Sequence, residues 1–66
     1  MRIRFEGSGY DAEIEENKPI SIRDALRKAK IPESMVIVSF DDNILPHSTI
    51  IEGDLVLLVT SVASGG

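Results

Sequence analysis

The residues with the most distinctive chemistry in this sequence are Gly65 and Gly66, the last two of its 66 residues. Neither has a Cβ atom, so this end of the chain can lie extended in a channel too narrow for side chains. A terminal carboxylate does not react with amines or sulfide at neutral pH until it is activated, for example as an acyl-adenylate. We therefore interpret Gly65 and Gly66 as the substrate segment that an activating enzyme recognises, rather than as part of an active site. The alternative is an ordinary Gly- and Ser-rich terminus without a function.

No other group of residues predicts a catalytic or metal site. His47 is the single histidine, and no Ser or Cys nucleophile stands at a recognisable spacing from it, so we expect a solvated loop side chain. The chain has no Cys, which excludes disulfides and Cys-based metal sites. We expect no bound metal, no permanently bound cofactor and no enzymatic activity of the chain itself.

The length of the chain predicts one domain with a small core. A chain of this size buries roughly 60% of its surface on folding, which holds one helix against one sheet and leaves little room for an enclosed catalytic pocket. We expect a folded domain over residues 1–60 and a flexible tail over residues 61–66.

The balance of charge is acidic, with seven Lys and Arg against 11 Asp and Glu and a net charge of -4. A nucleic-acid backbone needs a basic surface, so we expect no nucleic-acid partner. An acidic surface suits a basic patch on a protein partner, or serves solubility alone. An alternating pattern follows Met1 directly, without a signal peptide or long apolar span, and we expect a cytoplasmic protein that does not bind membranes.

The first half of the chain predicts a hairpin and a helix. Residues 2–6 and 10–16 alternate apolar and polar side chains around a Gly-Ser-Gly turn, as two half-buried strands do. Ser21 is a good N-cap, with Asp24 three residues later. An apolar stripe at helical spacing follows, and Pro32 stops the helix; the stripe consists of Ile22, Ala25, Leu26 and Ala29.

The second half predicts strands only. The apolar run over residues 35–40 is typical of a central strand covered on much of both faces. A turn over residues 41–43 leads to a short edge strand over 44–46, and residues 48–52 form a connector. Gly53 and Asp54 predict a turn, with Gly53 at positive φ and Asp54 accepting local backbone hydrogen bonds. Residues 55–60 form the last strand, which is apolar on both sides.

These elements predict an α+β fold of order β-β-α-β-β-β, with one helix packed across one face of a mixed four- to five-stranded sheet. The first and last strands are expected to be parallel neighbours in its middle. If Leu57 faces the helix, Val56 and Leu58 face away and, with Ile37, form an exposed apolar patch. In the opposite phase these residues belong to the core. A contiguous exposed patch on so small a protein would indicate a partner surface.

Three stretches carry a resemblance to a known family: residues 38–48 (VSFDDNILPHS), residues 51–58 (IEGDLVLL) and residues 62–66 (VASGG). With the element order, they resemble the ubiquitin-like β-grasp proteins. The closer likeness is to the prokaryotic sulfur carriers, which comprise the thiamine-pathway carrier, the small subunit of molybdopterin synthase and the small archaeal modifier proteins. The sequence departs from the family pattern at His47, where Arg is common, and at Ser64, where Ala or another small residue is usual.

The resemblance implies that a ubiquitin-activating-type adenylating enzyme uses ATP to activate Gly66, and that a sulfur donor then yields a thiocarboxylate for thiamine, molybdopterin or tRNA thiolation. It also implies that Val56, Leu58, Val62 and Ile37 contact the partner. A sulfur acceptor protein would be a further partner. The alternative is a protein modifier joined through Gly66 to lysines of target proteins. A third hypothesis is a non-catalytic β-grasp binding module with an incidental terminus.

Overall fold

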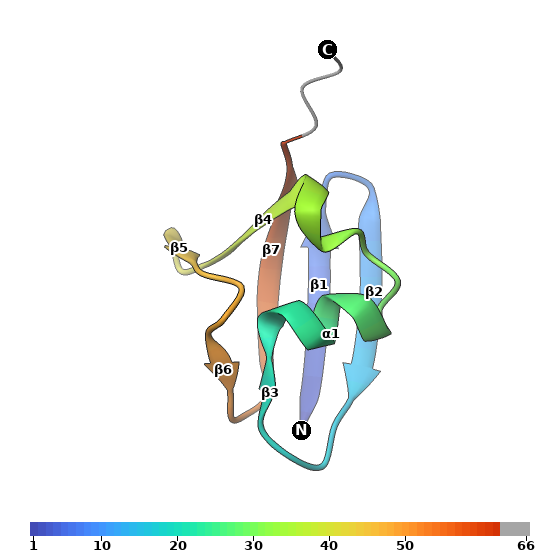
Figure 1. Cartoon of the computed structure of the whole chain (residues 1–66), viewed down its shortest axis with the longest axis vertical. Coiled ribbons are helices and arrows are strands. Elements are labelled where there is room, and N and C mark those ends of the chain that lie inside the picture. Colours follow the sequence, from blue (N-terminus) through green and yellow to red (C-terminus); the bar gives the residue numbers. More distant parts are fainter. Residues whose placement is uncertain (63–66) are drawn as a thin grey trace.

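Over the part of the chain that the structure describes, the protein is a small α+β structure with one α-helix and a mixed five-stranded sheet (Figure 1). The computed structural model describes residues 1–62. Along the chain the elements are β1 (Arg2–Gly7), β2 (Tyr10–Glu15), β3 (Ile20–Ser21), α1 (Ile22–Lys28), the 3-10 turn η1 (Glu33–Met35), β4 (Val36–Phe40), β5 (Asn43–Leu45), β6 (Ile50–Ile51) and β7 (Leu55–Ser61).

The main sheet has the strand order β2-β1-β7-β4-β5. Strands β1 and β7 pair in parallel, and the other pairs are antiparallel. The prediction that the first and last strands are parallel neighbours in the middle of the sheet is therefore confirmed. The parallel pairing carries the C-terminal end of β7 to the end of the molecule that also holds the β1–β2 turn (Figure 1).

Helix α1 begins at the predicted cap, because the Ser21 Oγ accepts a hydrogen bond from the Asp24 amide at 3.1 Å. Its end differs from the prediction. The helix stops four residues before Pro32 in a Schellman motif, in which the Ile31 and Lys30 amides donate to the Leu26 and Arg27 carbonyls. Lys30 takes the left-handed conformation of that motif, with φ of 61°. No helix within residues 1–62 has the length and hydropathy needed to cross a membrane.

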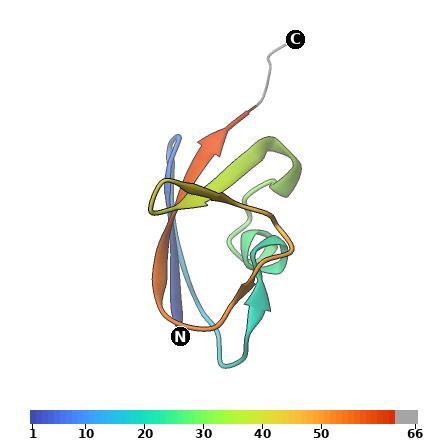
Figure 2. The same ribbon diagram turned by 90° about the vertical axis from the view of Figure 1, so that its left-hand side faces the viewer.

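The core lies between α1 and one face of the sheet (Figure 2). Its fully buried large side chains are Ile3, Phe5, Ile22, Leu26, Val38, Leu57 and Val59. The expectation that the strand at residues 35–40 is covered on much of both faces is wrong for the described residues, because α1 covers only one face of the sheet. On the other face, which we call the open face, side chains of β4 and β7 are half-buried or exposed.

The connector predicted over residues 48–52 contains a strand. Strands β3 and β6 form a separate antiparallel pair in which Ile20 opposes Ile51. Both side chains are buried, and Ile51 is only 4% exposed. The β3–β6 pair covers the core beyond the edge of the main sheet. This explains why the short segment over residues 48–52 contains the buried apolar residue Ile51.

The turn before β7 also differs from the prediction. Gly53 does not take a positive φ, and a Cβ atom at this position would meet nothing within 4 Å. The Asp54 carboxylate accepts a hydrogen bond at 2.6 Å from the distant Arg2 amide rather than from a local one. Asp54 therefore joins the start of β7 to the start of β1, its parallel neighbour.

Candidate functional site

The pairing register decides which side chains lie on the open face. In β7, Leu57 and Val59 are buried at 0% and 1% exposure, whereas Val56 and Leu58, which alternate with them along the strand, are 51% and 53% exposed. Val56 and Leu58 therefore lie on the open face, the first of the two phases that the sequence allowed. Ile37, from β4, is half-buried on the same face, because it opposes Thr60 in the register.

Apolar residues occupy one half of the open face. Leu58 lies opposite Ser39 of β4, and Ser39 lies opposite Ile44 of β5, so these side chains form one row across three strands. Ile44 is 70% exposed. Ile44 lies in the expected edge strand, but the sequence pattern alone indicates no role for it. The short turn after β4, which fixes the pairing of β4 with β5, is the signal that places Ile44 on the open face. We call Ile37, Ile44, Val56 and Leu58 the apolar half.

Charged residues occupy the other half of the open face, on β1 and β2. The Arg4 guanidinium contacts the carboxylates of Glu6 and Asp11, each at 2.6 Å. The hydrogen bond to Glu6, followed by the charge of Asp11, raises the pKa of Arg4 above its usual value. Arg2 lies 3.4 Å from Glu13. These arginines and carboxylates already pair with one another. We therefore expect a protein partner to bind the apolar half rather than the charged half of the open face.

A shallow hollow of about 240 Å³ lies at the edge of the apolar half. Val56, Leu58 and Phe40 supply its apolar wall, and Asp41 and Asp42 supply acidic groups. Both aspartates take positive φ, 52° and 67°, which forms the tight turn between β4 and β5. A hollow with an apolar wall and an acidic rim is suited to an apolar protein surface that carries a basic side chain.

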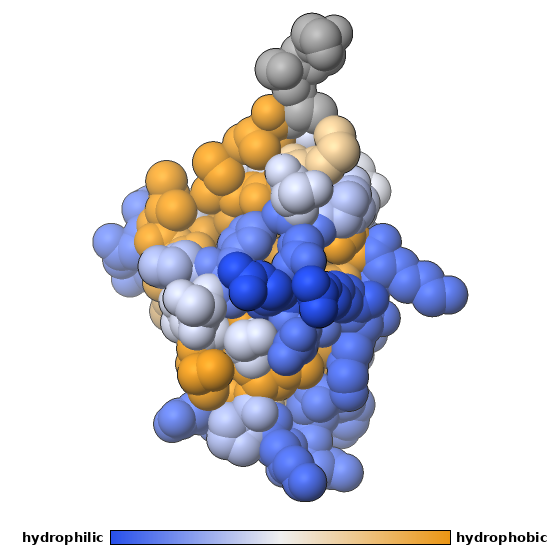
Figure 3. Space-filling view, viewed as in Figure 1, coloured by the Kyte–Doolittle hydropathy of each residue, from blue (hydrophilic) through white to orange (hydrophobic). Residues whose placement is uncertain are grey.

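The apolar character continues to the end of the described chain. Val62 follows β7 directly and is 45% exposed. Its amide donates a hydrogen bond to the Met35 carbonyl at 2.9 Å. In the view from the helix side, hydrophobic residues extend along the edge beside β4 toward this end, whereas hydrophilic residues lie over α1 (Figure 3). Gly65 and Gly66 lie outside the described residues.

Strand β7 continues through Ser61, one residue past the expected domain boundary at residue 60. Val56 and Leu58 of the apolar half therefore lie on the strand that leads to Val62. A protein that docks on Val56 and Leu58 lies beside the point at which β7 ends.

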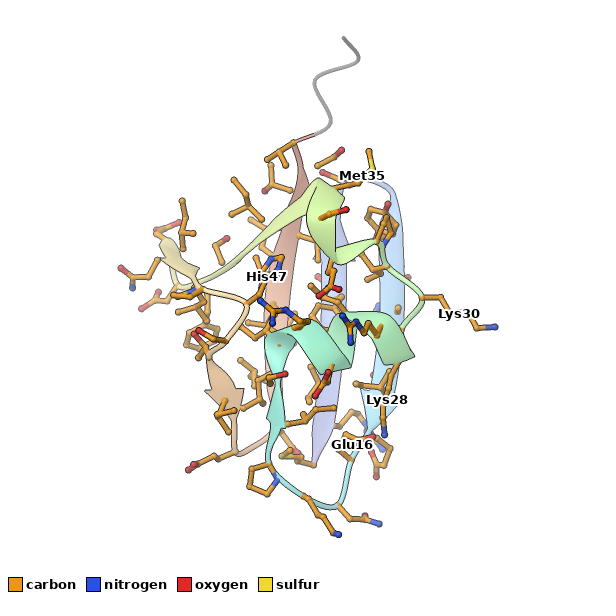
Figure 4. The ribbon with its side chains drawn as sticks, in the orientation of Figure 1. Glu16, Lys28, Lys30, Met35 and His47 are labelled. Atoms are coloured by element: carbon orange, nitrogen blue, oxygen red, sulfur yellow. The ribbon has the colours of Figure 1, made fainter. Side chains whose placement is uncertain are left out.

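The remaining candidates lie on the helix side. His47 is half-buried, and its carbonyl accepts a hydrogen bond from the Arg23 amide at 2.9 Å. It lies beside Arg23, Arg27 and Glu33, and Figure 4 shows it directed toward the helix. The solvated loop side chain expected for His47 is therefore only partly exposed. Within residues 1–62, no cluster of three or more His, Asp or Glu has the arrangement of a metal site.

The helix lysines differ in their surroundings. Lys28 Nζ lies 2.6 Å from the Glu16 carboxylate and ties the helix to the end of β2, whereas Lys30 extends away from the molecule (Figure 4). Because the Lys28 side chain is 55% exposed, this ion pair contributes little to the free energy of folding.

The candidate site consists of the apolar half, Val62 and the Gly65–Gly66 end that follows. Its described part lies on a flat sheet face rather than in a cleft, which favours contact with a protein over capture of a small molecule. Comparisons of the chain with models of protein families and with curated proteins found no match.

Proposed function

We propose that the chain is a sulfur carrier of the ubiquitin-like β-grasp type, and that Gly66 is the residue on which an adenylating enzyme acts. The observation that carries the proposal is that Val56 and Leu58, two exposed residues of the apolar half, lie on β7, the strand that precedes Gly65 and Gly66 in the sequence. One partner can dock on Val56 and Leu58 while it receives the glycines that follow.

The chemistry needs nothing from the chain except a reachable carboxylate. A Gly66 carboxylate oxygen attacks the α-phosphorus of ATP, the bond from that phosphorus to the bridging oxygen breaks, and pyrophosphate leaves. Hydrosulfide then attacks the acyl carbon, AMP leaves with its phosphate oxygen, and a proton is released as the thiocarboxylate forms. The activating partner supplies the ATP site, so the proposal requires neither catalytic residues nor a bound cofactor in this chain.

Two structural features support this proposal. The strand order and the single helix on one face are compatible with a β-grasp fold. The open face presents exposed apolar side chains, which a protein partner can contact.

The test is the intact mass of the chain after incubation with a candidate adenylating enzyme, ATP and sulfide. We expect one oxygen to be replaced by sulfur, and we expect the chain lacking residues 65 and 66 to remain unchanged. If the same enzyme thiolates another carrier protein but produces no oxygen-to-sulfur replacement in this chain, the sulfur-carrier proposal is contradicted.

The same adenylate would yield an isopeptide if a lysine amine attacked it in place of sulfide. The alternative of a protein modifier therefore predicts Gly-Gly remnants on lysines of cellular proteins. Remnants without any thiocarboxylate would favour that alternative. An unchanged cellular phenotype after deletion of residues 65 and 66 would favour a binding module.

A further inference from the structure

The end of β7 is held from both sides, but by two different kinds of partner. On the β4 side, backbone pairing extends to Ser61, which opposes Val36, and the Met35 carbonyl then accepts from the Val62 amide. On the β1 side, backbone pairing ends earlier, where Glu6 opposes Leu58. The Ser61 amide therefore points toward a side on which the ladder has already stopped.

A side chain takes the place of the missing backbone partner. The Ser8 hydroxyl accepts a hydrogen bond from the Ser61 amide at 2.9 Å, across 53 residues of sequence. We call the Ser8 hydroxyl and the Met35 carbonyl together the exit clamp. They accept hydrogen bonds from two successive amides, those of Ser61 and Val62, on opposite edges of the strand. These are the last two residues that the structure describes.

The β1–β2 turn is shaped for this contact. A Cβ atom on Gly7 would lie 2.4 Å from the Val59 carbonyl oxygen, so only glycine allows the turn to approach β7 this closely. Ser8 itself has φ of 48°, a conformation that is uncommon for residues other than Gly, Asn and Asp. This positive φ belongs to the two-residue turn over Ser8 and Gly9, as it also does in the turn between β4 and β5. The role of Ser8 therefore rests on the contact that its side chain makes with β7.

We infer that Ser8 is a positioning residue for activation of the C-terminus, because it fixes the direction in which the chain leaves β7. The inference rests on the proposed function. When a partner docks on the open face, a fixed exit direction reduces the conformational freedom that must be lost before Gly66 reaches the reacting phosphorus. Ser8 does not lie in the apolar half, so its loss should affect the step after docking rather than docking itself.

The test compares four substitutions with the wild-type chain. Ser8→Gly and Ser8→Ala both remove the hydroxyl, but glycine suits the positive φ and alanine does not, so an effect that they share belongs to the hydroxyl. Ser8→Asn tolerates this φ and offers a side-chain oxygen as a replacement acceptor. Ser48→Gly makes the same exchange at an exposed loop position and serves as the control.

Two readouts are needed. Amide hydrogen exchange at Ser61, measured by NMR, reports the clamp without any enzyme. ATP–pyrophosphate exchange with a candidate activating enzyme reports kcat and KM. We expect Ser8→Gly and Ser8→Ala to speed Ser61 exchange and to lower kcat, each about fivefold, the size of one neutral hydrogen bond. KM should stay within about twofold, because docking is unaffected. Ser8→Asn should restore both readouts, and Ser48→Gly should change neither.

An unchanged rate of amide hydrogen exchange at Ser61 in the Ser8 variants would overturn the inference. Faster amide hydrogen exchange with an unchanged kcat would overturn it as well. Either result leaves the proposed function standing if the wild-type chain supports pyrophosphate exchange. A wild-type chain that supports none, with an enzyme active on another carrier, would contradict the proposed function and this role of Ser8 with it.

Discussion

At the scale of single residues, the main distinction lies between apolar side chains that hold the fold and those that face solvent. Leu57 and Leu58 are neighbours in β7, yet the first is fully buried and the second is 53% exposed. The exposed leucine contributes little to the free energy of folding but is available to a partner. The two roles can therefore be separated by substitution.

Leu58→Ala is expected to raise KM for activation roughly tenfold, because it removes a central apolar side chain of the proposed docking surface. Its free energy of unfolding should change by less than about 1 kcal/mol, since the side chain is half exposed. Ile50→Ala is a matched control, because Ile50 has the same 53% exposure but lies on β6, outside the open face. Enzyme kinetics and urea unfolding check the prediction; an equal rise in KM for both variants would contradict it.

Two glycines should respond oppositely to the same substitution. Gly7→Ala should lower the free energy of unfolding by about 2 kcal/mol or more, because the Cβ atom would meet the Val59 carbonyl at 2.4 Å and φ is 116°. Gly53→Ala should be neutral or stabilising by up to about 1 kcal/mol, since the site is open and φ is not positive. Urea denaturation of both variants checks this, and similar losses would contradict the account of these turns.

At the scale of elements, the sequence predicts strands and helix well where local chemistry decides them. The Ser21 cap, the apolar stripe of α1 and the alternation in β1 each depend on near neighbours, and the structure has all three. The β3–β6 pair was missed because two-residue strands have no periodicity, and only the distant pairing of Ile20 with Ile51 defines them.

The sequence could not decide how many faces of β4 and β7 are covered. Both strands are apolar on both sides, which is also typical of strands buried between two layers. One seven-residue helix covers only one face, so the same residues form the apolar half. The Ser8 contact could not be predicted either, because it joins residues 53 positions apart.

Ile51→Ala is expected to lower the free energy of unfolding by about 2–4 kcal/mol, because the side chain is 4% exposed and its removal leaves a cavity. Glu52→Ala, at the exposed neighbouring position, should change it by less than about 0.5 kcal/mol. Thermal and urea unfolding check both values. A loss below about 1 kcal/mol for Ile51→Ala would mean that the β3–β6 pair is not part of the core.

At the scale of the whole molecule, folding and the proposed activity depend on different parts of the chain. Among residues 1–62, the buried core residues all lie between Ile3 and Val59. We therefore expect removal of residues 65 and 66 to leave the thermal unfolding midpoint unchanged while abolishing activation. Differential scanning calorimetry beside an activation assay checks this; a clear loss of stability would show that the terminus belongs to the folded body.

The central claim is that a partner enzyme adenylates the carboxylate of Gly66. ATP–pyrophosphate exchange catalysed by the candidate activating enzyme measures this step directly, before sulfur or lysine chemistry can intervene. We expect ATP–pyrophosphate exchange that depends on the intact chain and is lost when residues 65 and 66 are removed. Equal exchange with the shortened chain, or none with the intact chain when another carrier is active, would contradict it.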